Sequence, residues 1–231
     1  MRIGILQCGH TPDLVAERHG AYAAMFDTLF AGEGLDFRVW NVVDMDFPDG
    51  PDAAEGWLVT GSRHGVYDDL PFIAPLEQLV RDIHAADKPM VGICFGHQII
   101  AQALGGHVEK FAGGWSVGHR TYHWDGLGDI ALNAWHQDQV ITPPPGARTI
   151  AGNDFTRHAA LLYGDSILTV QPHPEFPNDI VRTYTEAYGG SDRYPPGTIE
   201  AAVRTLDQPV DDRRIGHLMA EFLKHRTLAD V

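Results

Sequence analysis

The sequence predicts an α/β fold in three layers, with helices on both faces of a mainly parallel central sheet to which antiparallel strands are added. Through the first hundred residues, short apolar runs of strand length alternate with segments of helical periodicity. That order is typical of parallel strands joined by crossover helices. From about residue 107 to 170 the pattern changes to short strand-like runs separated by turns, which indicates antiparallel strands.

The elements follow from these patterns in chain order. Strands are expected over residues 3–8, 37–43, 57–60 and 89–94. Helices are expected over residues 14–30, 73–86, 98–104, 181–188 and 215–225, and glycines follow the first and third of them. No internal repeat or linker interrupts the chain. We therefore expect a single domain over residues 1–231, with a core of residues 1–190 and a helical tail of residues 191–231.

Charge and composition exclude several classes of partner. Seventeen Lys and Arg residues against thirty-one Asp and Glu residues give a net charge of −14, which repels nucleic-acid phosphates and anionic membrane surfaces. No apolar run approaches the roughly 20 residues that span a bilayer, and no leader pattern precedes the first strand. The two cysteines form no disulfide framework. We expect a cytoplasmic protein without nucleic-acid or membrane partners.

Cys94 lies where a strand is expected to end and a helix to begin. The string Gly92-Ile93-Cys94-Phe95-Gly96 matches a nucleophile elbow, in which small residues on both sides permit a sharp strand-to-helix turn. The N–H groups at the start of the helix favour a thiolate and can stabilise an oxyanion. Cys8 ends the first strand with no helix directly after it. We therefore interpret Cys94 as a nucleophile and Cys8 as a packing residue.

A base and its partner are found after the last expected strand of the sheet. His173 lies between Pro172 and Pro174, and Glu175 follows two residues later. In an extended segment, residues two apart point the same way. A cysteine nucleophile needs a proton acceptor that a third group orients, so we assign His173 as the base and Glu175 as its partner.

Four segments together carry a family resemblance. They are Leu-Val-Thr-Gly-Ser at 58–62, Gly-Ile-Cys-Phe-Gly-His-Gln at 92–98 with Leu-Gly-Gly at 104–106, Trp-His-Gln-Asp-Gln-Val at 135–140, and Gln-Pro-His-Pro-Glu-Phe at 171–176. With them, the chain resembles a class I glutamine amidotransferase, the triad-type glutaminase domain. It is most similar to the stand-alone members that resemble the glutaminase domain of GMP synthase. The resemblance implies a flavodoxin-like sheet.

The resemblance also implies roles for the residues that match its motifs. Cys94 would be the nucleophile, His173 the base and Glu175 its partner. The backbone N–H groups of Gly61 and Phe95 would form the oxyanion hole.

Substrate contacts are implied at four further positions. The Gln98 side chain would help to hold glutamine, and the segment with His136, Gln137 and Asp138 would bind its amino-acid end. Gln137 stands where some relatives have glycine. His97 lies within the same motifs and is expected to line the pocket with His136.

No metal or cofactor is expected. His119 and His123 are four residues apart, but their segment looks extended and contains no His-Glu-x-x-His motif. The glycine-rich segment 113–118 has neither the spacing nor the helix entry of a phosphate loop. A tight turn with a packed Trp115 and a wall of the pocket are equal alternatives for it.

The expected reaction is hydrolysis of the γ-carboxamide of glutamine through a γ-glutamyl thioester, with release of ammonia for an acceptor. Family members commonly supply a synthetase, and this chain has no nucleotide-binding loop of its own, so the acceptor enzyme would be a partner in trans. Two alternatives stay open. One is a stand-alone hydrolase of γ-glutamyl peptides or amides, and the other is a non-catalytic regulatory or binding module.

Overall fold

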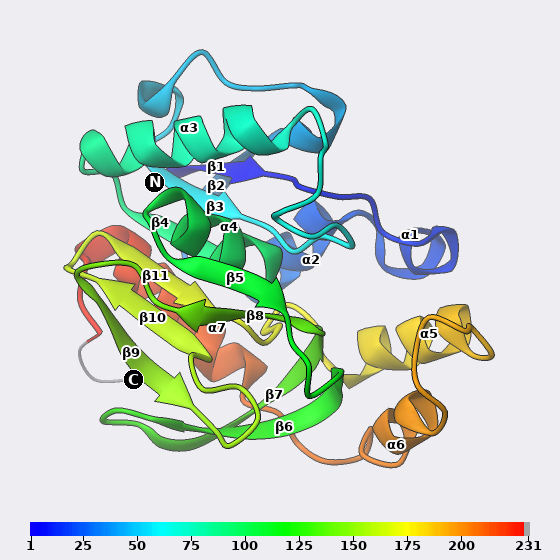
Figure 1. Ribbon diagram of the computed structural model, residues 1–231. Coiled ribbons are helices and arrows are strands. Elements are labelled where there is room, and N and C mark those ends of the chain that lie inside the picture. Colours follow the sequence, from blue (N-terminus) through cyan, green and yellow to red (C-terminus); the bar gives the residue numbers. More distant parts are fainter. Residues whose placement is uncertain (229–231) are drawn as a thin grey trace.

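A nine-stranded mixed sheet forms the centre of the part of the chain that the structure describes. The structure is a computed structural model and describes residues 1–228, so residues 229–231 of the expected tail lie outside it. The strand order is β2-β1-β3-β4-β11-β10-β9-β6-β7 (Figure 1). The first five strands of this order are mutually parallel, and the remaining four are joined through antiparallel pairs.

The strands are short in the parallel part and longer in the outer hairpin. The parallel strands are β1 (Arg2–Leu6), β2 (Asp36–Trp40), β3 (Gly56–Val59), β4 (Met90–Ile93) and β11 (Ile167–Val170). The antiparallel strands are β6 (Ser116–Trp124), β7 (Gly128–His136), β9 (Ala147–Gly152) and β10 (Ala160–Tyr163). A separate two-stranded sheet pairs β5 (His107–Lys110) with β8 (Asp138–Thr142).

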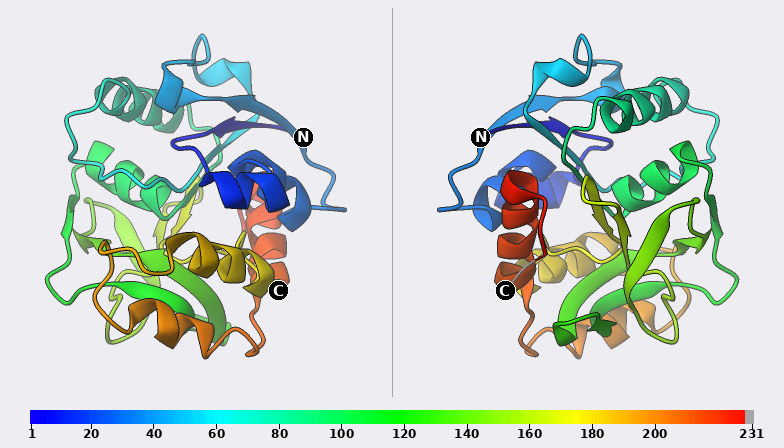
Figure 2. Two further views of the ribbon diagram at one scale, coloured as in Figure 1. Left: turned by 90° about the vertical axis from the view of Figure 1, so that its right-hand side faces the viewer. Right: turned by 90° about the vertical axis from the view of Figure 1, so that its left-hand side faces the viewer.

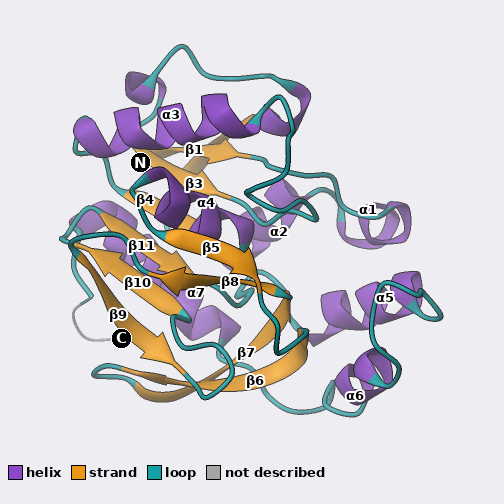
Figure 3. Cartoon of the chain, in the orientation of Figure 1, coloured by secondary structure: helices purple, strands orange, loops and turns teal. Residues whose placement is uncertain are grey.

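Helices cover both faces of the sheet, and the sheet separates two hydrophobic cores. One face carries α1 (Asp13–His19), α2 (Tyr22–Leu29), α5 (Asn178–Tyr188) and α7 (Asp212–His225), and the other carries α3 (Ile73–Ala85) and α4 (Phe95–Ala103) (Figure 2). Phe26 and Phe222 are fully buried in the first core, and Trp57 and Leu76 in the second. The predicted three-layer α/β fold is confirmed, and Figure 3 shows how strands and helices separate into these layers.

Several expected element boundaries differ from the structure. The single helix expected over residues 14–30 is wrong: Gly20, with φ of 80°, separates α1 from α2. A side chain there would meet the Ala24 side chain at 2.9 Å, so only glycine permits this turn. The strand expected over 37–43 ends at Trp40, and α6 (Thr198–Val203) was not anticipated. The single domain stays a prediction.

No helix within residues 1–228 has both the length and the apolar character that crossing a membrane requires. The helix with the longest span, α7, carries charged residues on one side and buries apolar residues such as Ile215 and Leu218 on the other. It therefore covers the sheet as an ordinary amphipathic helix.

Two glycines allow α4 to lie directly against the sheet. A Cβ atom at Gly96 would come within 2.1 Å of the Val59 carbonyl oxygen in β3, and one at Gly92 would come within 2.7 Å of the Gly96 carbonyl oxygen. Real Cβ atoms do not approach backbone oxygens so closely. The steric reason for small residues on both sides of Cys94 is therefore visible as direct backbone contact.

The substitution Gly96→Ala is expected to lower the free energy of unfolding by about 1–3 kcal/mol, the usual cost of forcing an extra methyl group into a packed core. The new methyl group would push α4 away from the Val59 carbonyl. Urea denaturation of the two proteins measures the difference. An unchanged urea midpoint would contradict the close contact between α4 and β3.

Candidate active site

Cys94 occupies the turn between β4 and α4. Its backbone has φ of 52° and ψ of −102°, a conformation that costs a non-glycine residue about 1–3 kcal/mol. The turn is held from the sheet side, because the Cys94 N–H donates to the Val170 carbonyl at 2.9 Å. The N–H groups in the first turn of α4, including that of Phe95, have no acceptor within the helix. The thiol therefore lies at the positive end of α4, and it is 5% exposed.

His173 and Glu175 form a buried pair beside this thiol. His173 Nδ1 lies 2.7 Å from Glu175 Oε1, and their side chains are 4% and 0% exposed. The His173 N–H donates to the Asn133 carbonyl at 2.8 Å, and its ring stacks on Phe176 with centroids 4.2 Å apart. Burial opposes a charged imidazole, but the charges of Glu175 and Cys94 outweigh it and raise the pKa of His173 well above its usual range.

Gly61 lies against the two side chains that the sequence assigns to nucleophile and base. A Cβ atom placed there would be 3.0 Å from His173 Cε1 and 3.8 Å from Cys94 Cβ. Its backbone is thus close to the Cys94 side chain. The structure brings together Cys94, His173, Glu175 and Gly61, with Phe95 directly following the thiol.

Cys8 fixes the loop that contains Gly61. The Cys8 N–H donates to Thr60 Oγ1 at 3.0 Å, and Ser62 Oγ donates to the Cys8 carbonyl at 2.8 Å. The Cys8 thiol is fully buried, donates to the Leu6 carbonyl, and has a pKa raised by burial. Cys8 therefore packs, as the sequence indicates, and its backbone positions the neighbouring loop.

Gln98 and His136 converge on one backbone carbonyl. Gln98 Nε2 donates to the Asp138 carbonyl at 2.8 Å and to Gln171 Oε1 at 3.1 Å, and His136 Nδ1 lies 3.2 Å from the same Asp138 oxygen. Burial and the nearby His173 lower the pKa of His136 to about 3. His136 is therefore neutral, with Nδ1 as the donor. Within residues 1–228, its Nε2 has no hydrogen-bond partner and remains an acceptor.

The side chains of Gln137 and Asp138 are held by neighbouring elements. Tyr67 Oη donates to Asp138 Oδ2 at 2.9 Å, and burial raises the pKa of Asp138. Gln137 Nε2 donates to the Phe111 carbonyl at 3.4 Å. All four expected substrate-binding residues line one pocket together with Cys94.

The expectation that His97 lines the pocket is wrong. Its side chain is fully buried against the sheet, with Nδ1 2.8 Å from Thr169 Oγ1, and burial lowers its pKa to about 3. The reason is helical geometry: His97 lies on the face of α4 that packs on β11, whereas Gln98 lies on the face toward β8.

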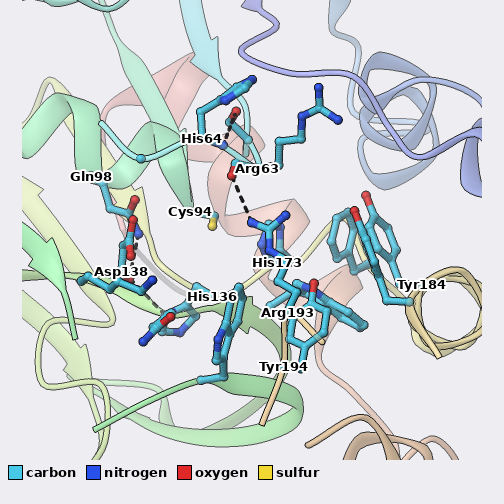
Figure 4. Close-up of a pocket in the computed structure, with 18 of the residues that line it drawn as sticks. Arg63, His64, Cys94, Gln98, His136, Asp138, His173, Tyr184, Arg193 and Tyr194 are labelled. Atoms are coloured by element: carbon cyan, nitrogen blue, oxygen red, sulfur yellow. Dashed lines mark hydrogen bonds between the residues drawn. The ribbon is translucent and has the colours of Figure 1, made fainter. Parts of the chain in front are cut away.

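A cavity of about 260 Å³ surrounds the Cys94 thiol (Figure 4). Trp135 and Phe176 of the quoted motifs also line it. The sequence reasoning did not single out the other aromatic side chains of the lining, namely Tyr22, Tyr67, Tyr184, Tyr188 and Tyr194, or the basic side chains Arg63, Lys110 and Arg193. Trp115 also lines it, so the glycine-rich segment contributes a wall of the pocket. The four-residue spacing of Tyr184 and Tyr188 places both side chains on one face of a helix. This spacing was the sequence signal that could have indicated the aromatic lining of the cavity.

One group of possible metal ligands exists within the described residues, and it lies away from this cavity. Glu33, His217 and Glu221 place their ligand atoms within 4.8 Å of one another. Lys224 Nζ lies 2.6 Å from Glu221 Oε1 and 3.5 Å from Glu33 Oε2. An ammonium group thus already pairs with both carboxylates, and the group is better explained as an ion-pair network between α7 and the turn that follows α2.

Comparison with known proteins adds independent information. The family model described as glutamine amidotransferase class-I matches residues 54–180. Gamma-glutamyl peptidase 2 of Arabidopsis thaliana is 26% identical over 97% of this chain and 96% of its own length. GMP synthase of Thermosynechococcus vestitus is 29% identical over 77% of this chain but only 37% of its own length.

The fold is also found in solved structures. The structure of a glutamine amido transferase from Methylobacillus flagellatus has a TM-score of 0.77, with 24% identity over 98% of this chain and 92% of that one. It supports the fold, whereas the family assignment rests on the match to the family model. Because that match covers more than half of the chain and includes the segments around Cys94 and His173, the chain belongs to the class I glutamine amidotransferase family.

Proposed function

We propose that this protein hydrolyses γ-glutamyl amide bonds with Cys94 as the nucleophile, and that its substrates are γ-glutamyl peptides or amides rather than glutamine alone. The observation that carries the proposal is the Cys94 thiol at the start of α4 beside the buried His173–Glu175 pair, whose Nδ1 to Oε1 distance is 2.7 Å. This arrangement supports acyl transfer from a carboxamide to a thiolate.

The choice of substrate class rests on the relatives that match along their whole length. The Arabidopsis protein that covers 97% of this chain is named a gamma-glutamyl peptidase, whereas the GMP synthase matches over only 37% of its own length. These matches favour the stand-alone hydrolase. Glutamine hydrolysis for a synthetase partner in trans is the second candidate, which the resemblance to the GMP synthase glutaminase domain favours.

The proposed reaction begins with attack of the Cys94 thiolate on the γ-carbonyl carbon. The carbonyl oxygen becomes an oxyanion, and the N–H groups of Gly61 and Phe95 stabilise it, each by about 3 kcal/mol. The C–N bond then breaks while the imidazolium of His173 transfers its proton to the leaving nitrogen. A γ-glutamyl thioester and a free amine, or ammonia, result.

Water completes the cycle. Neutral His173 removes a proton from the attacking water, the thioester C–S bond breaks, and glutamate and the Cys94 thiolate are released. Glu175 is a positioning residue: it accepts from His173 Nδ1, which turns Nε2 toward the reacting atoms. The reaction requires that Cys94 is not oxidised to a disulfide. This requirement agrees with the cytoplasmic location that the cysteine content predicts.

The glutamyl end of the substrate would bind beside α4 and β8. Its α-ammonium group needs an acceptor, and the side-chain carbonyl oxygen of Gln98, which lines the cavity, supplies one. The backbone N–H groups of residues 136–138 would bind the α-carboxylate. The fixed Asp138 carbonyl, which receives bonds from both Gln98 and His136, keeps this segment in place.

Replacing Cys94 tests the nucleophile. Cys94→Ala is expected to lower the release of glutamate from γ-glutamyl compounds by at least about 10⁴-fold, because the covalent route is lost. The thermal unfolding midpoint should be kept, since alanine fits the same turn. Cys8→Ala is the matched control and should retain activity. Full turnover by Cys94→Ala would contradict the assignment.

Replacing Glu175 tests the source of the raised His173 pKa. In the wild type the imidazolium persists to alkaline pH, so activity that needs its proton also persists. In Glu175→Gln the main raising charge is gone, and the alkaline limb of kcat/KM should move to lower pH. NMR titration of the His173 ring follows the same change. Glu186→Gln, an exposed carboxylate paired with Arg18, is the control, and an unshifted limb in Glu175→Gln would contradict the coupling.

A substrate panel separates the candidate functions. We expect a higher kcat/KM for γ-glutamyl dipeptides than for glutamine. Higher turnover of glutamine would favour the glutaminase with a partner. Inertness toward all substrates, with no labelling of Cys94 by a chloroketone analogue of glutamine, would favour a binding module.

A further inference from the structure

The segment between α5 and α6 lines the cavity and is tied to the loop that follows β3. Arg193 in this segment donates from Nη2 to the Arg63 carbonyl at 3.2 Å, and its guanidinium carbon lies 5.6 Å from the centre of the Trp115 ring. This bond uses one of the five N–H donors of the guanidinium. The remaining donors have no partner within residues 1–228 and are available to a ligand in the cavity.

Positive charge is concentrated here in a chain whose net charge is −14. Arg63, Lys110 and Arg193 all line the cavity, and none forms an ion pair with a carboxylate in the described part of the chain. The one carboxylate lining the cavity, that of Asp138, is bonded by Tyr67. The cavity is therefore lined by three cationic side chains and one carboxylate, and this excess of positive charge favours an anionic group on the bound molecule.

Arg63 and Arg193 lie on one side of the thiol, whereas Lys110 is paired with Asp138 in the register of β5 and β8. In Figure 4, Gln98 and Asp138 lie to one side of Cys94, and Arg63 and Arg193 lie to the other. If the glutamyl group binds beside Gln98, the atoms released from the broken amide bond lie on the side of Arg193. Ammonia, the leaving group when glutamine is the substrate, has no anionic group that a guanidinium could bind.

The same side carries a continuous aromatic wall. The Trp135 ring centre lies 5.2 Å from that of Tyr184 and 5.8 Å from that of Tyr194, and Trp135 Nε1 donates to Tyr194 Oη at 2.9 Å. The Trp115 ring lies 4.6 Å from that of Tyr194. Such a wall binds flat apolar groups through ring contacts.

We propose that Arg193 binds the carboxylate of the leaving group, so that the preferred substrates are γ-glutamyl amino acids with an aromatic or large apolar side chain. This inference rests on the proposed function and adds the leaving group to it. The amino acid's nitrogen would face His173, its carboxylate would accept from Arg193, and its side chain would pack on Trp135, Tyr184 and Tyr194.

The experiment compares two substrates that differ only in the carboxylate, γ-glutamyl-phenylalanine and γ-glutamyl-phenethylamide. In the wild type, kcat/KM should be about 10- to 100-fold higher for the first, the range expected for hydrogen bonds to a charged group. In Arg193→Gln that ratio should fall to about one, through loss on γ-glutamyl-phenylalanine, with the phenethylamide changed less than about twofold. Arg193→Lys should restore part of the ratio.

Arg182→Gln is the matched control, since Arg182 lies on α5 and pairs with Asp207 away from the cavity. It should leave the substrate ratio unchanged. A ratio that stays high in Arg193→Gln, or a wild type without preference for the carboxylate, would overturn the role of Arg193 while the proposed hydrolase stands. A wild type that cleaves neither compound nor glutamine would instead overturn the proposed function, and this inference with it.

Discussion

The direct backbone contact between α4 and β3 is the constraint on which the rest of the structure depends. Gly96 allows the helix to lie directly against the Val59 carbonyl, and Cys94 at the start of the helix has a positive φ of 52°. A helix that began one turn later, or lay further from the sheet, would aim neither the thiol nor its first N–H groups at the carboxyl ends of the strands. Gly92 and Gly96 thus determine both the packing of α4 on the sheet and the position of the Cys94 thiol.

The buried His173–Glu175 pair is stabilised by the attraction between its two members. Burial alone opposes charged side chains, but His173 Nδ1 lies 2.7 Å from Glu175 Oε1, and the His173 backbone N–H donates to the Asn133 carbonyl. The Phe176 ring excludes water from one face of the imidazole. The low local dielectric strengthens the attraction within the pair. The position that β7 and β11 give to His173 therefore also determines its protonation state.

Features that depend on neighbours in sequence were predictable, and features that depend on tertiary convergence were not. The turn at Cys94 and the spacing of His173 and Glu175 are local, so the sequence indicated them, and the three layers followed from the order of strands and helices. His97 was misplaced because its motif does not say which face of α4 packs on the sheet. Arg193 gave no signal at all, because its segment reaches Arg63 across 130 residues of chain.

The contrast between net charge and local charge explains how an acidic protein would select the anionic leaving group that we propose. The field of a chain with net charge −14 weakens with distance through screening, about 8 Å at physiological ionic strength. In the proposed complex the carboxylate of the leaving group accepts from Arg193 inside the cavity, so the local charge governs its binding rather than the net charge. The aromatic wall would strengthen this interaction by excluding water. In this proposal, selection of the leaving group depends on the segment after α5, whereas the position of the nucleophile depends on the sheet. The preferred substrate can therefore change without disturbing Cys94.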